Sequence, residues 1–169
     1  LISLATGSVE SSSVSNIDID NLDAANLGNN PVLSLDFASV EDADVDNISV
    51  ESVANSGSTD EILEIAGAGS TASSDNLDIT NVDVTDAESA GVIDIATSRA
   101  RFTTVDTVTV DNATNVVTVD DSENDRSTVF VNISNVDANA TGKIVDITTL
   151  GGANDNDFVN IDSVTASNL

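Results

Sequence analysis

The residues of this chain that could do chemistry are its carboxylates. Thirty Asp and Glu residues accompany four Lys and Arg residues, and the chain contains no His and no Cys. Without His and Cys it cannot form a Ser-His-Asp or Cys-His triad or the usual zinc sites. Pairs of carboxylates that resemble glycosidase acids arise readily among thirty acids, so they are not specific. We therefore expect no enzyme, and the cation that these oxygen ligands suit best is Ca²⁺.

Two loops have the composition of a calcium site. Residues 120–125 read Asp-Asp-Ser-Glu-Asn-Asp, and residues 151–157 read Gly-Gly-Ala-Asn-Asp-Asn-Asp. Calcium takes six to eight oxygen ligands from such residues, although neither loop matches the EF-hand pattern. The alternative is that both loops are solvated acidic turns. The candidate metal ligands are Asp120, Asp121, Glu123, Asp125, Asp155 and Asp157. A third segment, residues 41–46, alternates acids so that they could share one face.

The elements that must position these acids are short strands that recur along the chain. One pattern, apolar-x-apolar-x-x-apolar, begins at Ile17, Ile48, Leu77, Val108, Val131 and Val159. A second pattern, apolar-apolar-x-apolar, begins at Val32, Ile62, Val92, Val116 and Ile144. The two series keep step, and both shorten at the fourth repeat. Alternation with period two indicates strands. A regular recurrence over this length of chain marks repeats that bury their apolar faces against one another.

The repeats predict an all-β fold, a stacked β-solenoid or β-helix with repeats of about 23–31 residues. An antiparallel β-sandwich is the alternative, since short strands separated by turns also describe that fold. Uniform strands joined by spacers of variable length favour the solenoid. The chain also lacks Asn-Gly and Asp-Gly, the dipeptides typical of tight hairpins. Phe102, Phe130 and Phe158 recur at one constant spacing, which predicts either a stacked aromatic ladder or side chains that fill the core.

We expect two segments. Residues 1–15 form an N-terminal arm or cap, with an ordinary cap, an exchanged strand and a disordered lead all left open, and residues 16–169 form a single repeat domain. The last copy of the repeat is short, so we expect an open strand edge that pairs with another copy of the chain. The middle positions of the strands predict two polar ladders on the outer face, in which adjacent Asp residues would need salt or a cation between them. The first pattern gives Asp18, Ser49, Asp78, Thr109, Asn132 and Asn160, and the second gives Ser34, Glu64, Asp94, Thr118 and Asp146.

Charge restricts the partners. The net charge is −26, which excludes nucleic acid and anionic membranes as direct partners because both are polyanions. No run of 18 apolar residues is present, so we expect no membrane insertion. Repulsion among so many acids calls for screening by salt or divalent cations. The partner we expect is a homo-oligomer or polymer of the same chain.

Residues 151–164, GGANDNDFVNIDSV, resemble the glycine- and aspartate-rich nonapeptide of repeats-in-toxin proteins, with Asn154 and Asn156 in place of that pattern's Gly and Asp. Segments such as FVNISNVDA resemble the strand repeats of bacterial and archaeal surface-layer proteins and giant adhesins. The resemblance implies secretion, calcium-aided folding and a structural or adhesive role at the cell surface. We therefore expect a secreted structural protein that self-assembles into an extracellular surface layer, sheath or filament. The alternative is an adhesin or stalk module of a longer cell-surface protein.

Overall fold

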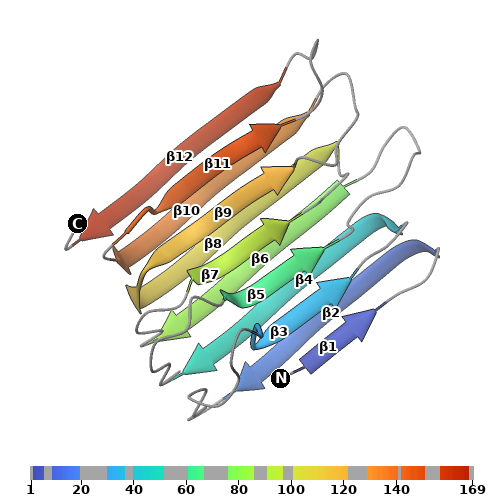
Figure 1. The fold of residues 1–169 in the computed structure, drawn as a ribbon, viewed down its shortest axis with the longest axis horizontal. Coiled ribbons are helices and arrows are strands. Elements are labelled where there is room, and N and C mark those ends of the chain that lie inside the picture. The colour runs from blue at the N-terminus through green and yellow to red at the C-terminus, as the bar shows by residue number, and fades with distance from the viewer. Residues whose placement is uncertain are drawn as a thin grey trace.

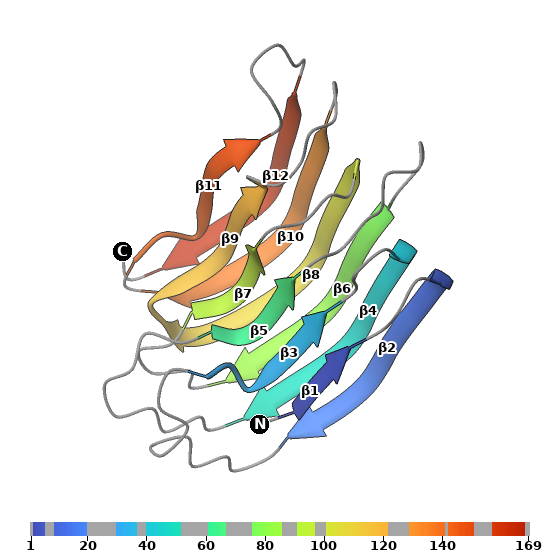
Figure 2. The ribbon, with the colours of Figure 1, turned by 45° about the vertical axis from the view of Figure 1, so that its right-hand side comes forward.

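The computed structural model describes residues 2–5, 9–19, 30–36, 40–51, 61–66, 76–85, 91–96, 101–121, 129–140, 142–150 and 157–167. These residues form two six-stranded sheets that face each other (Figures 1 and 2). Sheet A holds β1 (Ile2–Ala5), β3 (Leu33–Asp36), β5 (Glu61–Ala66), β7 (Gly91–Ala96), β9 (Asn115–Asp121) and β11 (Val145–Leu150). Sheet B holds β2 (Val9–Ile19), β4 (Val40–Glu51), β6 (Asn76–Thr85), β8 (Phe102–Ala113), β10 (Phe130–Ala140) and β12 (Phe158–Ser167).

The predicted solenoid is confirmed. Odd-numbered strands lie in order in sheet A and even-numbered strands lie in order in sheet B, so the chain alternates between the sheets and advances by one strand in each. Every strand pairing in the described part of the chain is parallel, which rules out the antiparallel sandwich. The described residues contain no helix, and so none long and apolar enough to cross a membrane.

The core lies between the two sheets and consists of small aliphatic side chains. In sheet A the second pattern is in register as predicted, and its positions stack in buried rows: Leu33, Leu63, Ile93 and Val117 form one, and Leu35, Ile65, Ile95 and Val119 form another. β-branched residues suit such rows because they pack well on a pleated surface. Burial of one such side chain contributes about 1.5–3 kcal/mol, so the repeated rows stabilise the stack.

Sheet B carries a bend that explains the first sequence pattern. One residue in each strand has a positive φ between 52° and 58°, at Asn16, Asn47, Asn81, Thr107, Asn135 and Ser163. We call this set the bend column. A left-handed residue interrupts the in–out alternation, so two consecutive side chains face outward before the apolar series resumes. That interruption is the x-x in apolar-x-apolar-x-x-apolar. Asn tolerates this backbone conformation better than most residues, which accounts for four of the six positions.

The bend also corrects our alignment of the first pattern. In the structure the first residues of the pattern that lie side by side in sheet B are Ser12, Ala43, Leu77, Thr103, Val131 and Val159. Our predicted starts at Ile17, Ile48 and Val108 were wrong, because they lie after the bend while Leu77, Val131 and Val159 lie before it. The error arose because apolar alternation exists on both sides of the bend. The spacing of registered positions in sheet B consequently varies along the chain, and it is longest from β4 to β6 and shortest from β6 to β8.

The polar ladders are therefore more numerous than we predicted. The single ladder expected in the first pattern, with Asp18 and Asp78 in one row, was wrong for the same reason. Asp18 belongs to a row after the bend, whereas Asp78 belongs to a row before it. The ladder predicted for the second pattern, which contains Ser34, Glu64 and Asp94, is confirmed.

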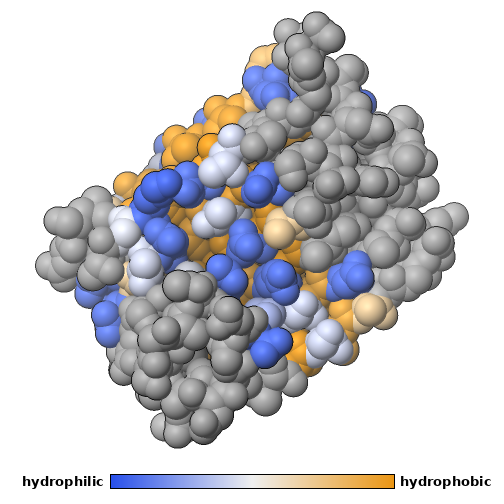
Figure 3. All heavy atoms as spheres, viewed as in Figure 1, coloured by the Kyte–Doolittle hydropathy of each residue, from blue (hydrophilic) through white to orange (hydrophobic). Residues whose placement is uncertain are grey.

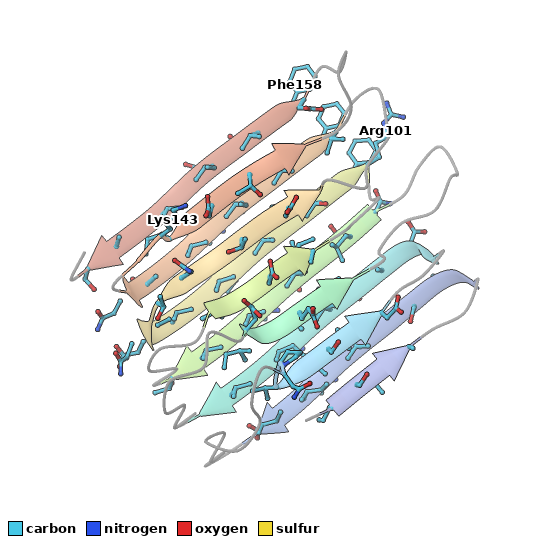
Figure 4. All side chains as sticks on the ribbon, viewed as in Figure 1. Arg101, Lys143 and Phe158 are labelled. Atoms are coloured by element: carbon cyan, nitrogen blue, oxygen red, sulfur yellow. The ribbon has the colours of Figure 1, made fainter. Side chains whose placement is uncertain are left out.

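The aromatic ladder is confirmed. Phe102, Phe130 and Phe158 occupy one register row, and neighbouring ring centroids are 5.0 Å apart with interplanar angles of 12° and 9°. The Arg101 guanidinium lies 5.3 Å from the Phe102 ring centroid, in a cation–π contact (Figure 4). The ladder lies at the start of β8, β10 and β12, and it stabilises their shared register.

Residues 1–15 contain β1 and the first part of β2. Ile2 and Leu4 pair with Leu33 and Leu35, so β1 is a sixth copy of the second pattern. β2 pairs with β4 in the same parallel register as the strands that follow. The sequence shows the alternation at Ile2 and Leu4, but so short a segment is not enough to identify a repeat.

Candidate functional site

The structure describes three of the six predicted calcium ligands. Asp120 and Asp121 end β9, and Asp157 precedes β12 and is exposed. Asp120 is half-buried, and its Oδ1 atom is buried without a hydrogen-bond partner. Glu123, Asp125 and Asp155 lie outside the described residues. Within the described ranges, no group of three or more acids is placed to hold a metal ion.

Two rows on the outer face of sheet B keep carboxylates apart, whereas a third row places Asp44 beside Asp78. The row just before the bend alternates hydroxyl and carboxylate side chains from strand to strand: Ser15, Asp46, Thr80, Asp106, Ser134 and Asp162. We call it the first alternating column. A second alternating column follows the bend and contains Asp18, Ser49, Asp83, Thr109, Asp137 and Thr165. Strands in a sheet lie about 4.8 Å apart, so alternation places like charges about 9.6 Å apart. That separation exceeds the Debye length at physiological salt, about 8 Å.

Carboxylates in the first alternating column accept hydrogen bonds from the next strand. Asp46 Oδ1 accepts from Thr80 Oγ1 and Asn81 Nδ2, both at 2.7 Å. Asp106 Oδ1 accepts from Ser134 Oγ at 2.6 Å and Asn135 Nδ2 at 2.7 Å.

These hydrogen bonds favour the charged form of each carboxylate. The bonds from Thr80 and Asn81 lower the pKa of Asp46 below its ordinary value, and the bonds from Ser134 and Asn135 do the same for Asp106. The bend column and the first alternating column therefore act together, because each supplies donors to the same acids.

Sheet A departs from this alternation. Its outer row reads Ser3, Ser34, Glu64, Asp94, Thr118 and Asp146, which places Glu64 beside Asp94. Figure 3 shows hydrophilic side chains standing over this face. Burial, together with repulsion from Glu64 and Asp120, raises the pKa of Asp94 above its ordinary value. The Ser34 hydroxyl donates to Glu64 at 3.1 Å, and Lys143 pairs with Asp146 at 2.5 Å (Figure 4).

The two ends of the solenoid differ from its middle. β1 and β2 form the edges of the sheets at one end, and β11 and β12 form them at the other (Figure 1). The β12 residues that continue the buried rows are exposed: Val159 is 46% exposed and Ile161 is 49% exposed. By contrast, Ile133, which pairs with Ile161 from the neighbouring strand β10, is 0% exposed. Figure 3 shows hydrophobic residues at this end. Leu4 at the opposite end is 41% exposed. Both ends therefore present apolar side chains next to strand edges that have no partner strand among the described residues.

A shallow groove of about 340 Å³ lies on the outer face of sheet B along the bend. It crosses β4, β6 and β8 and is lined by Asn47, Ile48, Ser49, Asn81, Val82, Asp83, Thr107 and Thr109. Its described lining contains no aromatic side chain, and its polar atoms are amides, hydroxyls and the Asp83 carboxylate. These groups can hydrogen-bond a polar ligand.

The chain matches no protein-family model, and searches of curated proteins and of solved structures find no match. We therefore infer function from the geometry of the chain itself.

Sequence reasoning missed the bend column and the charge alternation. A recurrent tripeptide carries the signal for both, a hydroxyl or Asp residue, then Asn, Thr or Ser, then Ile or Val. It occurs at 15–17, 46–48, 80–82, 106–108, 134–136 and 162–164. The same pattern also occurs elsewhere, as at 103–105, 114–116 and 127–129, so it marks the bend only when it is combined with the spacing of the repeats.

Proposed function

We propose that this chain is a secreted structural protein that assembles with copies of itself into an extracellular surface layer, sheath or filament. The observation that carries the proposal is the pair of open ends, at which unpaired strand edges adjoin exposed apolar residues. An exposed edge with apolar neighbours is a template for pairing with another chain. The support for an extracellular role is the acidic composition and the resemblance of the repeats to those of surface-layer and adhesin proteins.

The charge pattern supports assembly along the solenoid axis. Strongly acidic outer faces repel one another from side to side, because the chain carries a net charge of −26. The two ends carry apolar rows instead. We therefore expect assembly to strengthen with salt, since screening reduces the overall repulsion and leaves the apolar contact intact.

Negative-stain microscopy and sedimentation of the purified chain test this proposal, using Ile161→Lys and the matched control Asn160→Lys. Both substitutions add one positive charge to β12, but Ile161 continues a buried row and Asn160 continues an outer one. We expect the wild type and Asn160→Lys to form polymers and Ile161→Lys to remain monomeric. A wild type that stays monomeric from low to high salt, with and without Ca²⁺, would refute the proposal.

Calcium binding remains part of the proposal. Its support is the buried Oδ1 atom of Asp120, which has no hydrogen-bond partner among the described residues and begins the acidic sequence segment 120–125. Calorimetric titration with CaCl₂ tests it, and we expect Asp120→Asn to weaken binding. The absence of any calcium heat from the wild type would remove calcium from the account.

A second candidate is an adhesin or stalk module, and the groove along the bend favours it. Amide and hydroxyl groups from three neighbouring strands line that groove, which would suit a polar ligand such as a carbohydrate. Binding to a panel of immobilised polysaccharides, with Asn81→Ala as the variant, would distinguish this function from assembly.

A further inference from the structure

We propose that copies of this chain stack head to tail in one fixed register, so that β1 and β2 of each copy continue the sheets of the copy before it. This inference rests on the proposed self-assembly and specifies its geometry. β2 of the next copy would lie beside β12, and β1 of the next copy would lie beside β11. The occupant of the open end is thus a second copy, placed where the next strands of the solenoid would lie.

The apolar rows continue across such a joint. In sheet B, Ile161 lies beside Val14 of the next copy, Val164 beside Ile17 and Ala166 beside Ile19, extending rows that are buried in the middle of the solenoid. In sheet A, Val145 and Ile147 lie beside Ile2 and Leu4 of the next copy, following the register of the pairs within the chain. Ile2, Val14, Ile17, Ile19 and Val164 are only partly buried in the single chain. The joint would complete their burial.

The charge columns also continue without conflict. The first alternating column begins with Ser15 and ends with Asp162, so the joint places a carboxylate beside a hydroxyl. The second alternating column begins with Asp18 and ends with Thr165, which gives the same pairing in the opposite order. In sheet A, Asp146 meets Ser3. At the joint, therefore, no acid faces an acid in any of these three rows, although the chain carries thirty acids.

The bend fixes the register of the joint. Ser163 has a φ of 54° and Asn16 has a φ of 58°, so both strands bend at the same position when Ile161 lies beside Val14. A shift of two residues would place Ile161 beside Ser12 or Asn16, and the two bends would no longer coincide. Between the two bends, inward side chains of one strand would then lie beside outward side chains of the other. The head-to-tail arrangement also leaves a free end at each step, so it can extend without limit, whereas a tail-to-tail contact closes as a dimer.

Cysteine cross-linking tests the polarity and the register, because the chain contains no Cys of its own. In the proposed register Asn160 lies beside Ser13 of the next copy, at a Cα separation of about 4.8 Å that a disulfide can span. We expect Ser13→Cys/Asn160→Cys to give a ladder of covalent oligomers under mild oxidation. Ser11→Cys/Asn160→Cys, which is shifted by two residues, is the matched control and should give none.

Charge rescue across the joint is an independent test. Thr165→Asp places a carboxylate beside Asp137 in its own chain and beside Asp18 of the next copy. We expect it to raise the critical concentration for assembly about two- to fivefold at low salt. Thr165→Asp/Asp18→Asn should restore assembly, whereas Thr165→Asp/Asp83→Asn, with the same net charge and a change in the same column, should not.

The outcomes separate this inference from the proposed function. Polymers with a ladder from the in-register pair support both. Polymers accompanied by a ladder from the shifted pair, by dimers from Asn160→Cys alone, or by no cross-link at all overturn the head-to-tail register while self-assembly stands. A wild type that forms no polymer under any condition overturns both.

Discussion

The alternating columns predict that a single added carboxylate will destabilise the fold in a salt-dependent way. Ser134 lies between Asp106 and Asp162 in the first alternating column and donates a hydrogen bond of 2.6 Å to Asp106. Ser134→Asp removes this donor and places three carboxylates in consecutive strands. Ser134→Asn is the matched control, because the Asn side chain has nearly the same size as Asp, carries no charge and can still donate a hydrogen bond.

The magnitude follows from the strand spacing. Two unit charges about 4.8 Å apart in water repel by about 0.9 kcal/mol, and the new carboxylate has two such neighbours. The repulsion is therefore about 1.5–2 kcal/mol at low salt. It falls to about half at physiological salt and to about a fifth at 1 M salt, as the Debye length shortens to about 3 Å. Loss of the hydrogen bond adds about 0.5–1 kcal/mol that does not depend on salt.

Thermal unfolding followed by far-UV circular dichroism, below the concentration at which polymers form, measures this effect. One kcal/mol corresponds to about 2–4 °C in Tm for a chain of this size. We expect Ser134→Asp to melt about 4–12 °C below Ser134→Asn in about 10 mM NaCl and about 2–6 °C below it in about 1 M NaCl. Equal melting temperatures at low salt, or a gap that does not narrow with salt, would refute the role assigned to charge alternation.

Three further predictions concern single positions. Asp94→Asn should stabilise the fold by about 0.2–1 kcal/mol at pH 7 by removing repulsion beside Glu64. Because the pKa of Asp94 is raised, this gain in stability should shrink as the pH falls through that pKa, since wild-type Asp94 then takes up a proton. A gain in stability that persists at pH 3 would contradict the raised pKa of Asp94. Asp106→Asn should be destabilising at neutral pH, and because the pKa of Asp106 is lowered, urea titrations should show the loss disappearing only as the pH falls below the ordinary value of 3.8. Thr103 is buried with its hydroxyl unpartnered, so Thr103→Val should stabilise by about 1 kcal/mol, and a destabilised variant would show that the hydroxyl has a partner.

The fold class could be predicted from the sequence because the apolar pattern is strong and periodic. The residues at Val32, Ile62, Val92, Val116 and Ile144 are in register in the structure, and the three Phe residues stack as their spacing predicted. In both cases the same kind of side chain recurs at the equivalent position of each repeat. The spacing of these residues is then enough to predict which of them lie side by side on neighbouring strands.

The register of sheet B could not be predicted from apolar pattern alone. The chain alternates apolar residues both before and after Asn47 or Asn135, and the left-handed residue between the two runs is a backbone property that hydropathy does not show. The charge alternation followed from that register and was therefore missed as well. All six calcium ligands remain predictions: Asp120 has one supporting observation, and Glu123, Asp125 and Asp155 lie outside the described residues.

The axial repeat of the polymer tests the central claim most directly. Each copy adds six strands to each sheet, so head-to-tail continuation predicts an axial rise of about 29 Å per copy and a strand spacing of about 4.8 Å along the same axis. Electron cryo-microscopy of the filaments measures both values in one power spectrum. The result we predict is this rise with all copies pointing the same way. A repeat of twice that length with alternating polarity, or strands that do not run across the filament axis, would contradict the account.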